Sequence, residues 1–247
     1  MTGWTFEPSP FGEVLVPSFL PDGFALFYST TDFPGYLREG GSSLIERFLG
    51  HRFGIEARLF TCTQVHGVRV ERVAASHDMP RESGDCDALY TDEQSVALGI
   101  KVADCLPVTV VDPEARVIAN IHSGWRGAAG EIVRRAVETI EQNTDFQSSR
   151  AYAYLGPSIR VCCFQVGEEV IERFGTIEDA RQFTDRDRSE RPHFDLPAFT
   201  RSVLTSRGLD QRRVFDSGIC TRCPDSRFHS YRRNGAGAGR NLAVAAQ

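Results

Sequence analysis

The stretch Val117–Gly127, which reads V-I-A-N-I-H-S-G-W-R-G, constrains the fold of this chain more than any other. Its first residues are mostly apolar and predict a buried strand. His122 comes at the end of that strand, and Ser123 and Gly124 follow it in a turn with small side chains. A rigid strand that ends in such a turn can position a reactive group and leave backbone open to a ligand.

The amphipathic pattern after this turn predicts a helix over Ala128–Gln142. The turn would then lie at a helix N-terminus, where free N–H groups favour an anion. Two apolar runs, 56–65 and 68–73, are expected to form a hairpin-like pair with His66 at its apex. The Pro-rich N-terminal segment of about 20 residues is expected to be irregular, apart from a short strand at Val14–Val16.

Strands and helices alternate along the rest of the chain. Strands are expected at 88–90, 96–102, 108–111 and 151–155, helices at 166–174 and 194–204, and a polar loop at 76–87. No internal repeat or linker divides these elements. The pattern therefore favours the α/β class, as a single mixed-sheet domain over residues 1–247 with flanking helices.

Composition excludes several classes of protein. The 247 residues are 41% hydrophobic and 25% charged, as in soluble globular proteins, and the net charge of −5 argues against a nucleic-acid partner. No apolar stretch is long enough to span a membrane, and the N-terminus has no signal-peptide pattern. Seven cysteines without a secretion signal are typical of a reducing compartment, so we expect a cytoplasmic protein.

His66, Cys105 and His122 each follow a strand-like run and lie beside Gly, Pro or Ser. Two imidazoles and one thiolate with a fourth position open make a catalytic zinc site, in which bound water has a pKa of about 7. Two ordinary histidines and a buried cysteine are the alternative, because the spacing matches no local zinc motif. Asp104 is expected to orient a ligand histidine, to act as a general base, or to be a solvated turn carboxylate.

Three arginines lie in glycine-containing segments suited to phosphate. Arg126 shares the segment S-G-W-R-G with Ser123, while Arg232 and Arg240 flank the glycines of the tail. We assign these four residues to the binding of substrate or phosphate. A flexible tail is the alternative reading of G-A-G-A-G-R.

Cys220 and Cys223 form a C-x-x-C pattern, which occurs in zinc half-sites and in redox pairs. No second C-x-x-C is present to complete a structural zinc site, and this disfavours that use. Cys62, Cys162 and Cys163 are interpreted as structural.

Several phrases together resemble the laccase-domain family, also called multicopper polyphenol oxidase-like, YfiH-like or peptidoglycan editing factor proteins. They follow the family's order from about residue 60 onward: T-Q-V-H-G (63–67), G-D-C-D-A-L-Y-T (84–91), V-A-D-C-L-P-V (102–108), I-H-S-G-W-R-G (121–127), L-G-P-S-I-R-V-C-C-F-Q-V-G-E-E-V (155–170), F-D-L (194–196), C-T (220–221) and H-S-Y-R-R-N-G-A-G-A-G-R (229–240). The resemblance implies the YfiH-like fold and a zinc ion held by the residues that match His66, Cys105 and His122.

The resemblance also implies purine nucleoside chemistry: phosphorolysis of adenosine, inosine, guanosine and methylthioadenosine, and deamination of adenosine. We therefore expect a zinc-dependent purine nucleoside phosphorylase with adenosine deaminase activity. His66, Cys105, His122 and Asp104 are its expected catalytic residues, purine nucleoside and phosphate its partners, and a monomer or small homo-oligomer its state.

One departure from the family bears on phosphate. The family usually carries T-R-x-G-G near its N-terminus, and its arginine is thought to help bind substrate or phosphate. Here the corresponding segment is S-T-T-D-F-P-G (29–35), with Thr31 in the place of arginine. This member is therefore weak, altered in substrate, or dependent on another arginine such as Arg126 or Arg232.

Two other activities are alternatives. Two histidines and a cysteine also suit copper, as in polyphenol oxidation. A multicopper cluster needs many more histidines, usually in His-x-His pairs, whereas this chain has six histidines and no such pair. Cys105 could also be the nucleophile of a Cys/His hydrolase acting on cell-wall precursors, with His66 or His122 as its base. A zinc-stabilised binding module fits less well, because a structural site fills all four positions.

Overall fold

The computed structural model describes residues 3–33, 41–75, 81–175, 180–186 and 190–247. The strands are β1 (Trp4–Ser9), β2 (Gly12–Pro17), β3 (Ala25–Ser29), β4 (Arg58–Thr63), β5 (Val70–Arg72), β6 (Glu82–Asp85), β7 (Ala88–Thr91), β8 (Val96–Val102), β9 (Leu106–Asp112), β10 (Val117–Ser123), β11 (Tyr152–Leu155), β12 (Thr184–Asp185), β13 (His193–Phe194), β14 (Val214–Asp216) and β15 (Asn241–Ala246). The α-helices are α1 (Gly41–Phe53), α2 (Trp125–Ala129), α3 (Ile132–Asn143), α4 (Glu168–Phe174), α5 (Leu196–Ser206) and α6 (Tyr231–Asn234). The 3-10 helices are η1 (Ser148–Arg150), η2 (Ala180–Phe183), η3 (Gln211–Arg213) and η4 (Gly235–Gly237).

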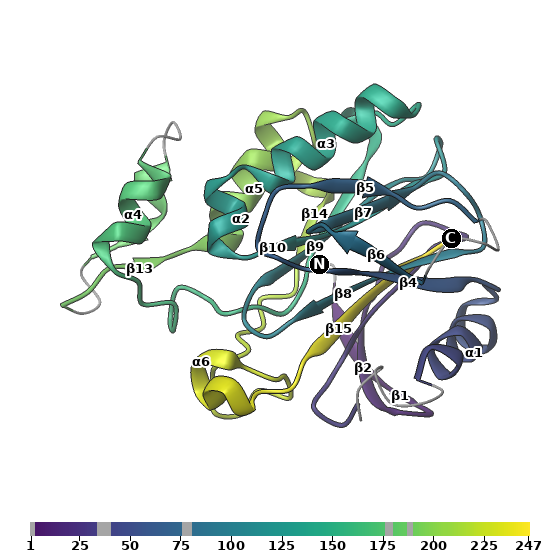
Figure 1. Ribbon diagram of the computed structural model, residues 1–247, viewed down its shortest axis with the longest axis horizontal. Coiled ribbons are helices and arrows are strands. Elements are labelled where there is room, and N and C mark those ends of the chain that lie inside the picture. Colours follow the sequence, from purple (N-terminus) through teal and green to yellow (C-terminus); the bar gives the residue numbers. More distant parts are fainter. Residues whose placement is uncertain (1–2, 34–40, 76–80, 176–179, 187–189) are drawn as a thin grey trace.

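Two mixed sheets form the centre of the protein (Figure 1). The seven-stranded sheet has the order β1-β2-β3-β15-β8-β4-β6, and the six-stranded sheet has the order β14-β11-β9-β10-β7-β5. Both sheets combine antiparallel pairs, such as β9 with β10, and parallel pairs, such as β4 with β8. The short strands β12 and β13 form a separate pair. The expected mixed α/β domain is confirmed, with two principal sheets.

Three apolar cores define four layers. One core lies between the sheets and joins Tyr28 and Phe60 of the first sheet to Val111 and Ile118 of the second. A second core packs α1 against the outer face of the seven-stranded sheet. The third packs α3 and α5 against the outer face of the six-stranded sheet, so the helices lie on opposite sides of the paired sheets (Figure 1). Burial on both faces explains why the central strands are almost wholly apolar.

Asn120 is the polar exception in the middle of β10. It is fully buried, and its amide donates hydrogen bonds to the carbonyl oxygens of Leu98 and Ala243, each at 3.0 Å. Those carbonyls belong to β8 and β15 of the other sheet. One side chain therefore ties the strand that carries His122 to the opposite layer, and its buried amide is satisfied.

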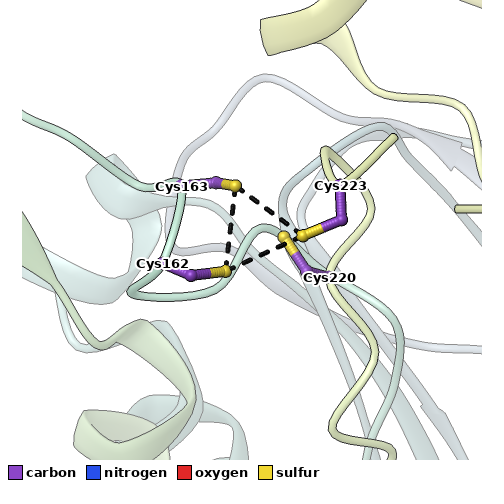
Figure 2. Close-up of side chains that lie close together, drawn as sticks. All are labelled: Cys162, Cys163, Cys220 and Cys223. Carbon is purple, nitrogen blue, oxygen red and sulfur yellow. Dashed lines mark hydrogen bonds between the residues drawn. The ribbon is translucent and has the colours of Figure 1, made fainter. Parts of the chain in front are cut away.

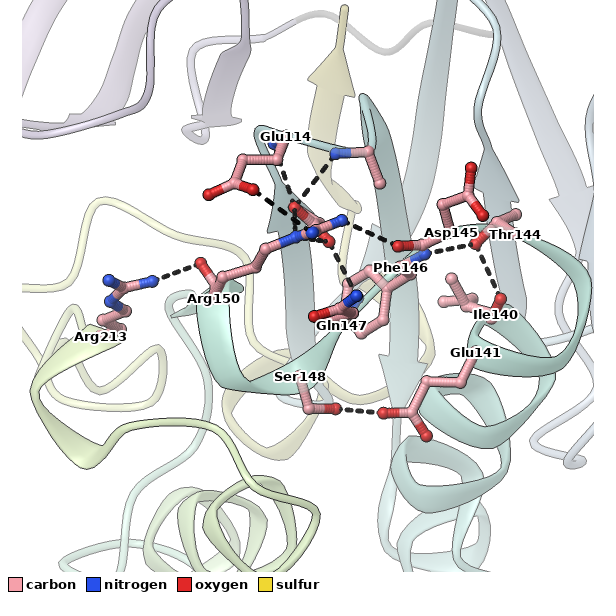
Figure 3. A network of polar contacts seen from close by, with 12 residues as sticks. Glu114, Ile140, Glu141, Thr144, Asp145, Phe146, Gln147, Ser148, Arg150 and Arg213 are labelled. Carbon is pink, nitrogen blue, oxygen red and sulfur yellow. Dashed lines mark hydrogen bonds and ion pairs between the residues drawn. The ribbon is translucent and has the colours of Figure 1, made fainter.

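A polar network fixes the far end of the same β9–β10 hairpin (Figure 3). The buried carboxylate of Asp112 accepts from Nε of Arg150 at 2.9 Å and from the backbone N–H of Glu114 at 3.0 Å and of Gln147 at 2.9 Å. Arg150 also donates to the carbonyl oxygen of Asp145 at 2.8 Å. The loop after α3 is thereby held against the hairpin, and the Asp112 charge is compensated.

The N-terminal segment differs from the sequence expectation. In place of irregular chain, β1 and β2 form an antiparallel hairpin along their whole length, with a turn at Gly12, whose φ is +108°. Pro8 is tolerated because β1 is the edge strand of its sheet, where a missing N–H breaks no ladder. Composition obscured a strand that pairing with the next strand along the chain stabilises.

The expected hairpin around His66 is also wrong. β4 belongs to the seven-stranded sheet and β5 to the six-stranded sheet, so residues 64–69 cross between the two layers. The predicted loop at 76–87 contains β6, which pairs in parallel with β4, and residues 76–80 of that segment lie outside the described part. His66 thus lies on a crossover.

The single helix predicted over 128–142 is divided in two. Glu131 adopts a left-handed conformation with φ of +64° between α2 and α3, which interrupts the hydrogen-bond ladder. Gly130 comes so close to Val68 that an added Cβ would lie 2.6 Å from its Cγ1. The predicted apolar face of α3, from Ile132 to Ile140, is buried as expected. In the described residues, no helix is long and apolar enough to cross a membrane.

Candidate metal centre

Three connections bring His66, Cys105 and His122 together. His122 lies near the end of β10, where its register partner on β9 is Pro107. Cys105 comes two residues before Pro107 in the turn between β8 and β9, so strand pairing places it beside His122. His66 arrives on the crossover from β4, with φ of +59°. The predicted convergence of these three residues is present in the structure.

The three side chains offer donor atoms that all lie within 4.8 Å of one another. Cys105 Sγ is 3.9 Å from His66 Nε2, and the two imidazole rings are edge to face with centroids 4.8 Å apart. His66 is exposed, Cys105 is half-buried and His122 is only 3% exposed. The group is therefore anchored on the buried side and open on the side of His66.

Asp87, which the sequence analysis did not single out, organises this group. Its Oδ1 accepts a hydrogen bond from His122 Nδ1 at 2.7 Å and from the backbone N–H of His66 at 3.0 Å. Its Oδ2 accepts from the N–H of Gly67 at 2.7 Å and of Val65 at 3.3 Å. A carboxylate on the second nitrogen of a histidine fixes the ring and its tautomer. The sequence signal was an acidic residue immediately before the apolar run of β7.

Electrostatics favour the ionised form of Cys105. Burial raises the pKa of its thiol, but hydrogen bonds and charge from His122 and His66 lower it more, to about 6. Burial lowers the pKa of His122, whereas its contacts with Asp87 and Cys105 raise it to about 9. The pKa of Asp87 falls below its usual value because His122 and the backbone of Gly67 outweigh burial. The thiolate is the form of cysteine that binds metal.

Gly124 completes the cradle. A Cβ added to this residue would lie 2.9 Å from Cys105 Sγ and 3.1 Å from His66 Cδ2, although the backbone itself is unstrained, with φ of −74°. Only a residue without a side chain leaves room for both donors. Two imidazoles, a thiolate, an orienting carboxylate and this gap fit a zinc ion with three protein donors and one open position.

Asp104 has a different set of partners from those expected. Its Oδ1 accepts from the hydroxyl of Thr221 at 2.6 Å, and its Oδ2 accepts from the backbone N–H of Arg232 at 2.6 Å. Its own carbonyl accepts from the N–H of Ile159 at 2.9 Å. The carboxylate bonded to His122 is that of Asp87, whereas the carboxylate of Asp104 joins the Cys105 turn to the Thr221 loop and to α6. Its use as a general base stays a prediction.

The four predicted substrate contacts are placed differently from one another. Arg126 is exposed, with its guanidinium stacked 4.4 Å above the Trp125 ring. Arg232 is exposed, and its backbone N–H donates to Asp104, the residue before Cys105. Arg240 donates to carbonyl oxygens of its own loop. Ser123 is fully buried, and its hydroxyl faces the interior because side chains alternate along β10, so its place among the substrate contacts stays a prediction.

Comparison with known proteins assigns the family. The family profile described as multi-copper polyphenol oxidoreductase laccase matches residues 45–247. The chain belongs to this laccase-domain family. A laccase-domain relative, the purine nucleoside phosphorylase YlmD of Geobacillus stearothermophilus, is 32% identical over 75% of this chain and 71% of its own length. The purine nucleoside phosphorylase of Deinococcus radiodurans is 36% identical over 73% of this chain and 67% of its own.

A third laccase-domain relative is named adenosine deaminase RL5 and comes from an unknown prokaryotic organism. It is 36% identical over 63% of this chain, and the match spans 60% of the relative's length. The crystal structure of YlmD from Geobacillus stearothermophilus superposes with a TM-score of 0.83, 26% identity and 98% coverage of both chains. This similarity confirms the expected laccase-domain fold.

The departure from the family that is expected at Thr31 lies outside the part of the chain that the family profile matches, so it stays a prediction. Thr31 is exposed, and its N–H donates to the carbonyl oxygen of Arg227 at 2.8 Å. Residues 34 and 35 of the same segment lie outside the described part. The nearby guanidinium of Arg227 is engaged with Glu13 at 2.8 Å.

Proposed function

We propose that this protein is a zinc-dependent purine nucleoside phosphorylase that also deaminates adenosine. The observation that carries the proposal is the open-sided group of His66, Cys105 and His122, set by Asp87. Support for the substrate class comes from relatives that are named for these two activities. Adenosine, inosine, guanosine and methylthioadenosine are the proposed nucleosides, with phosphate as second substrate.

The protein's own part is to hold the donor atoms and their protons in place. Bound zinc would supply Lewis-acid chemistry, by polarising a substrate atom and lowering the pKa of water to about 7. Asp87 keeps a proton on His122 Nδ1, which leaves Nε2 as the donor atom. The exposed side at His66 admits the nucleoside, and the proposed general base is Asp104.

Arg232 is the proposed phosphate contact in place of the missing family arginine. Its backbone is fixed to Asp104, and its guanidinium bonds only a neutral group in the described residues, the carbonyl oxygen of Gln165 at 2.8 Å. A guanidinium with donors left over binds phosphate well. Arg126 is the second candidate. Replacement of Arg232 by methionine is expected to raise the KM for phosphate and to leave adenosine deamination nearly unchanged.

The test combines metal analysis with turnover. Both wild-type protein and His122→Ala are purified without added metal. Compared with wild type, the variant is expected to contain about one zinc ion fewer per chain. It is also expected to lose the phosphate-dependent release of hypoxanthine from inosine. The matched control is His51→Ala, an exposed histidine on α1 in the opposite outer layer. Full nucleoside turnover in His122→Ala would refute the proposal. If wild-type protein contained zinc but turned over no nucleoside, the substrate assignment would be refuted and the metal centre would stand.

Copper oxidation is the competing proposal, because the family description names it. Oxidation needs oxygen, whereas phosphorolysis needs phosphate. Anaerobic assays with zinc-loaded and copper-loaded protein therefore separate the two activities. The cytoplasmic location and the state as a monomer or small homo-oligomer stay predictions.

A further inference from the structure

Four cysteines from two segments that are distant in the sequence meet in the fold (Figure 2). Cys162 and Cys163 lie in the loop after β11, and Cys220 and Cys223 lie in the loop between β14 and α6. Their sulfur atoms all lie within 4.8 Å of one another. Cys162 and Cys163 therefore supply the second pair of thiols that the C-x-x-C of Cys220 and Cys223 needs for a four-cysteine site.

The sulfur spacing matches a tetrahedral metal. Cys162 Sγ is 3.7 Å from Cys163 Sγ and 4.0 Å from Cys223 Sγ, and Cys163 Sγ is 3.9 Å from Cys223 Sγ. A tetrahedral ion with metal–sulfur bonds of about 2.3 Å holds its sulfur ligands roughly 3.8 Å apart. A disulfide requires about 2.05 Å, and all four cysteines are free thiols.

Groups around the cluster suit bound thiolates. The backbone N–H groups of Arg160, Arg222 and Cys223 favour the ionised form of the Cys220 sulfur. The guanidinium of Arg222 donates to Cys163 Sγ at 3.7 Å, and that of Arg233 donates to the carbonyl oxygen of Cys223 at 3.3 Å. Four thiolates around a divalent ion carry a net charge of −2, and these N–H groups and cations offset it.

We propose that Cys162, Cys163, Cys220 and Cys223 bind a structural zinc ion, distinct from the three-donor centre. Tetrahedral coordination by four sulfurs is typical of zinc sites with no open position. Binding displaces the thiol protons to solvent, and no oxidant is needed. Cys162 is exposed and the other three are half-buried, so the ion can enter from solution.

The ion would clamp two loops that already touch. The N–H of Ser158 donates to the carbonyl oxygen of Ile219 at 3.2 Å, and the N–H of Thr221 donates to that of Ser158 at 3.0 Å. Thr221 lies between the two tail cysteines and donates to Asp104, next to Cys105. The clamp therefore holds the segment that supports the neighbouring centre, and it links this second site to the geometry of the first.

Zinc content of single variants tests the proposal. Wild-type protein purified under reducing conditions without added metal is expected to bind about two zinc ions per chain. Cys162→Ser and Cys223→Ser are each expected to lose one, whereas His122→Ala loses the other. The matched control is Cys86→Ala, a cysteine outside both groups, which is expected to keep both ions. Zinc content that is insensitive to Cys162→Ser and Cys223→Ser would overturn the proposal.

A second measurement uses wild-type protein, so it does not depend on whether a variant folds. In wild-type protein, the exposed thiol of Cys162 is expected to resist a thiol reagent until a chelator removes the metal. Cobalt added to the chelated wild-type protein is expected to give the visible bands of a four-thiolate tetrahedral complex. Rapid labelling of Cys162 before chelation would refute the site, as would a disulfide between Cys220 and Cys223 in freshly purified protein. Either result is independent of nucleoside turnover.

Discussion

Asp87→Asn is the sharpest test of how the candidate centre is built. The substitution keeps the size of the side chain and removes one acceptor oxygen. In the structure, Oδ1 of Asp87 accepts from His122 and from the backbone of His66, while Oδ2 accepts from the backbone of Gly67 and Val65. An asparagine can satisfy one pair of donors only. In either orientation, its NH₂ group faces two N–H groups with nothing to accept them.

The magnitude follows from which pair is lost. Removal of a carboxylate that orients a metal-binding histidine weakens metal affinity by about 10- to 100-fold, which corresponds to about 1.4–2.8 kcal/mol. A buried donor left without an acceptor costs about 1–3 kcal/mol. Asp87 is fully buried, so water cannot replace the lost bonds. We expect a loss of about 2 kcal/mol in unfolding free energy, or about 4–8 °C in Tm for a chain of this size.

The assay is a titration in which a chelator competes with the protein for zinc. Only the zinc ion that is absent from His122→Ala is counted, and the Tm of each variant is measured as well. Asp92→Asn is the matched control, because it makes the same change just after β7 at a partly exposed ion pair with Arg72. Such a pair contributes about 0–1 kcal/mol. If Asp87→Asn bound zinc as tightly as wild-type protein and had the same Tm as Asp92→Asn, Asp87 would not organise the centre.

Three further variants separate the centre from the fold. Gly124→Ala should weaken zinc binding at the centre without lowering the Tm of the metal-free protein, since the new methyl group displaces the sulfur of Cys105 and no backbone strain arises; equal zinc affinity in the same titration would contradict the cradle. Asn120→Ala should cost about 3 kcal/mol in urea unfolding, because two buried carbonyl oxygens of the opposite sheet lose their donor. Arg150→Met should cost about 2 kcal/mol in the same measurement, since Asp112 keeps its backbone donors and loses its cation, and it should leave zinc content unchanged.

Local patterns predicted the elements whose burial follows a simple period. The apolar run 96–102 matches β8, and the face of α3 from Ile132 to Ile140 is buried as its spacing requires. The patterns failed where the pairing of strands decides the structure. β1 is stabilised by pairing with β2 in spite of its proline, and β4 and β5 look like one hairpin although they belong to different sheets. No local period encodes which sheet a strand joins.

The candidate site shows the same division. His66, Cys105 and His122 could be found in the sequence because each ends an apolar run, and the family phrases grouped them. Asp87 could not be separated from other acidic residues that begin strands, since its role depends on a register that brings its strand beside β10. The cysteine cluster escaped for a related reason. Its two halves lie on loops that meet only through the fold, and one half is an adjacent pair.

The gradient of exposure across His66, Cys105 and His122 bears on how a substrate would reach the proposed centre. His122 is buried and bonded to Asp87 behind it, so approach from this side is blocked. His66 is the exposed member, on a crossover whose three successive N–H groups are bound to the same carboxylate. If His66, Cys105 and His122 hold a metal ion, a substrate would reach it from the exposed side at His66. A substrate that entered there would meet a histidine whose loop is already held by Asp87. Binding would therefore not need to order that loop, and no binding free energy would be lost to ordering it.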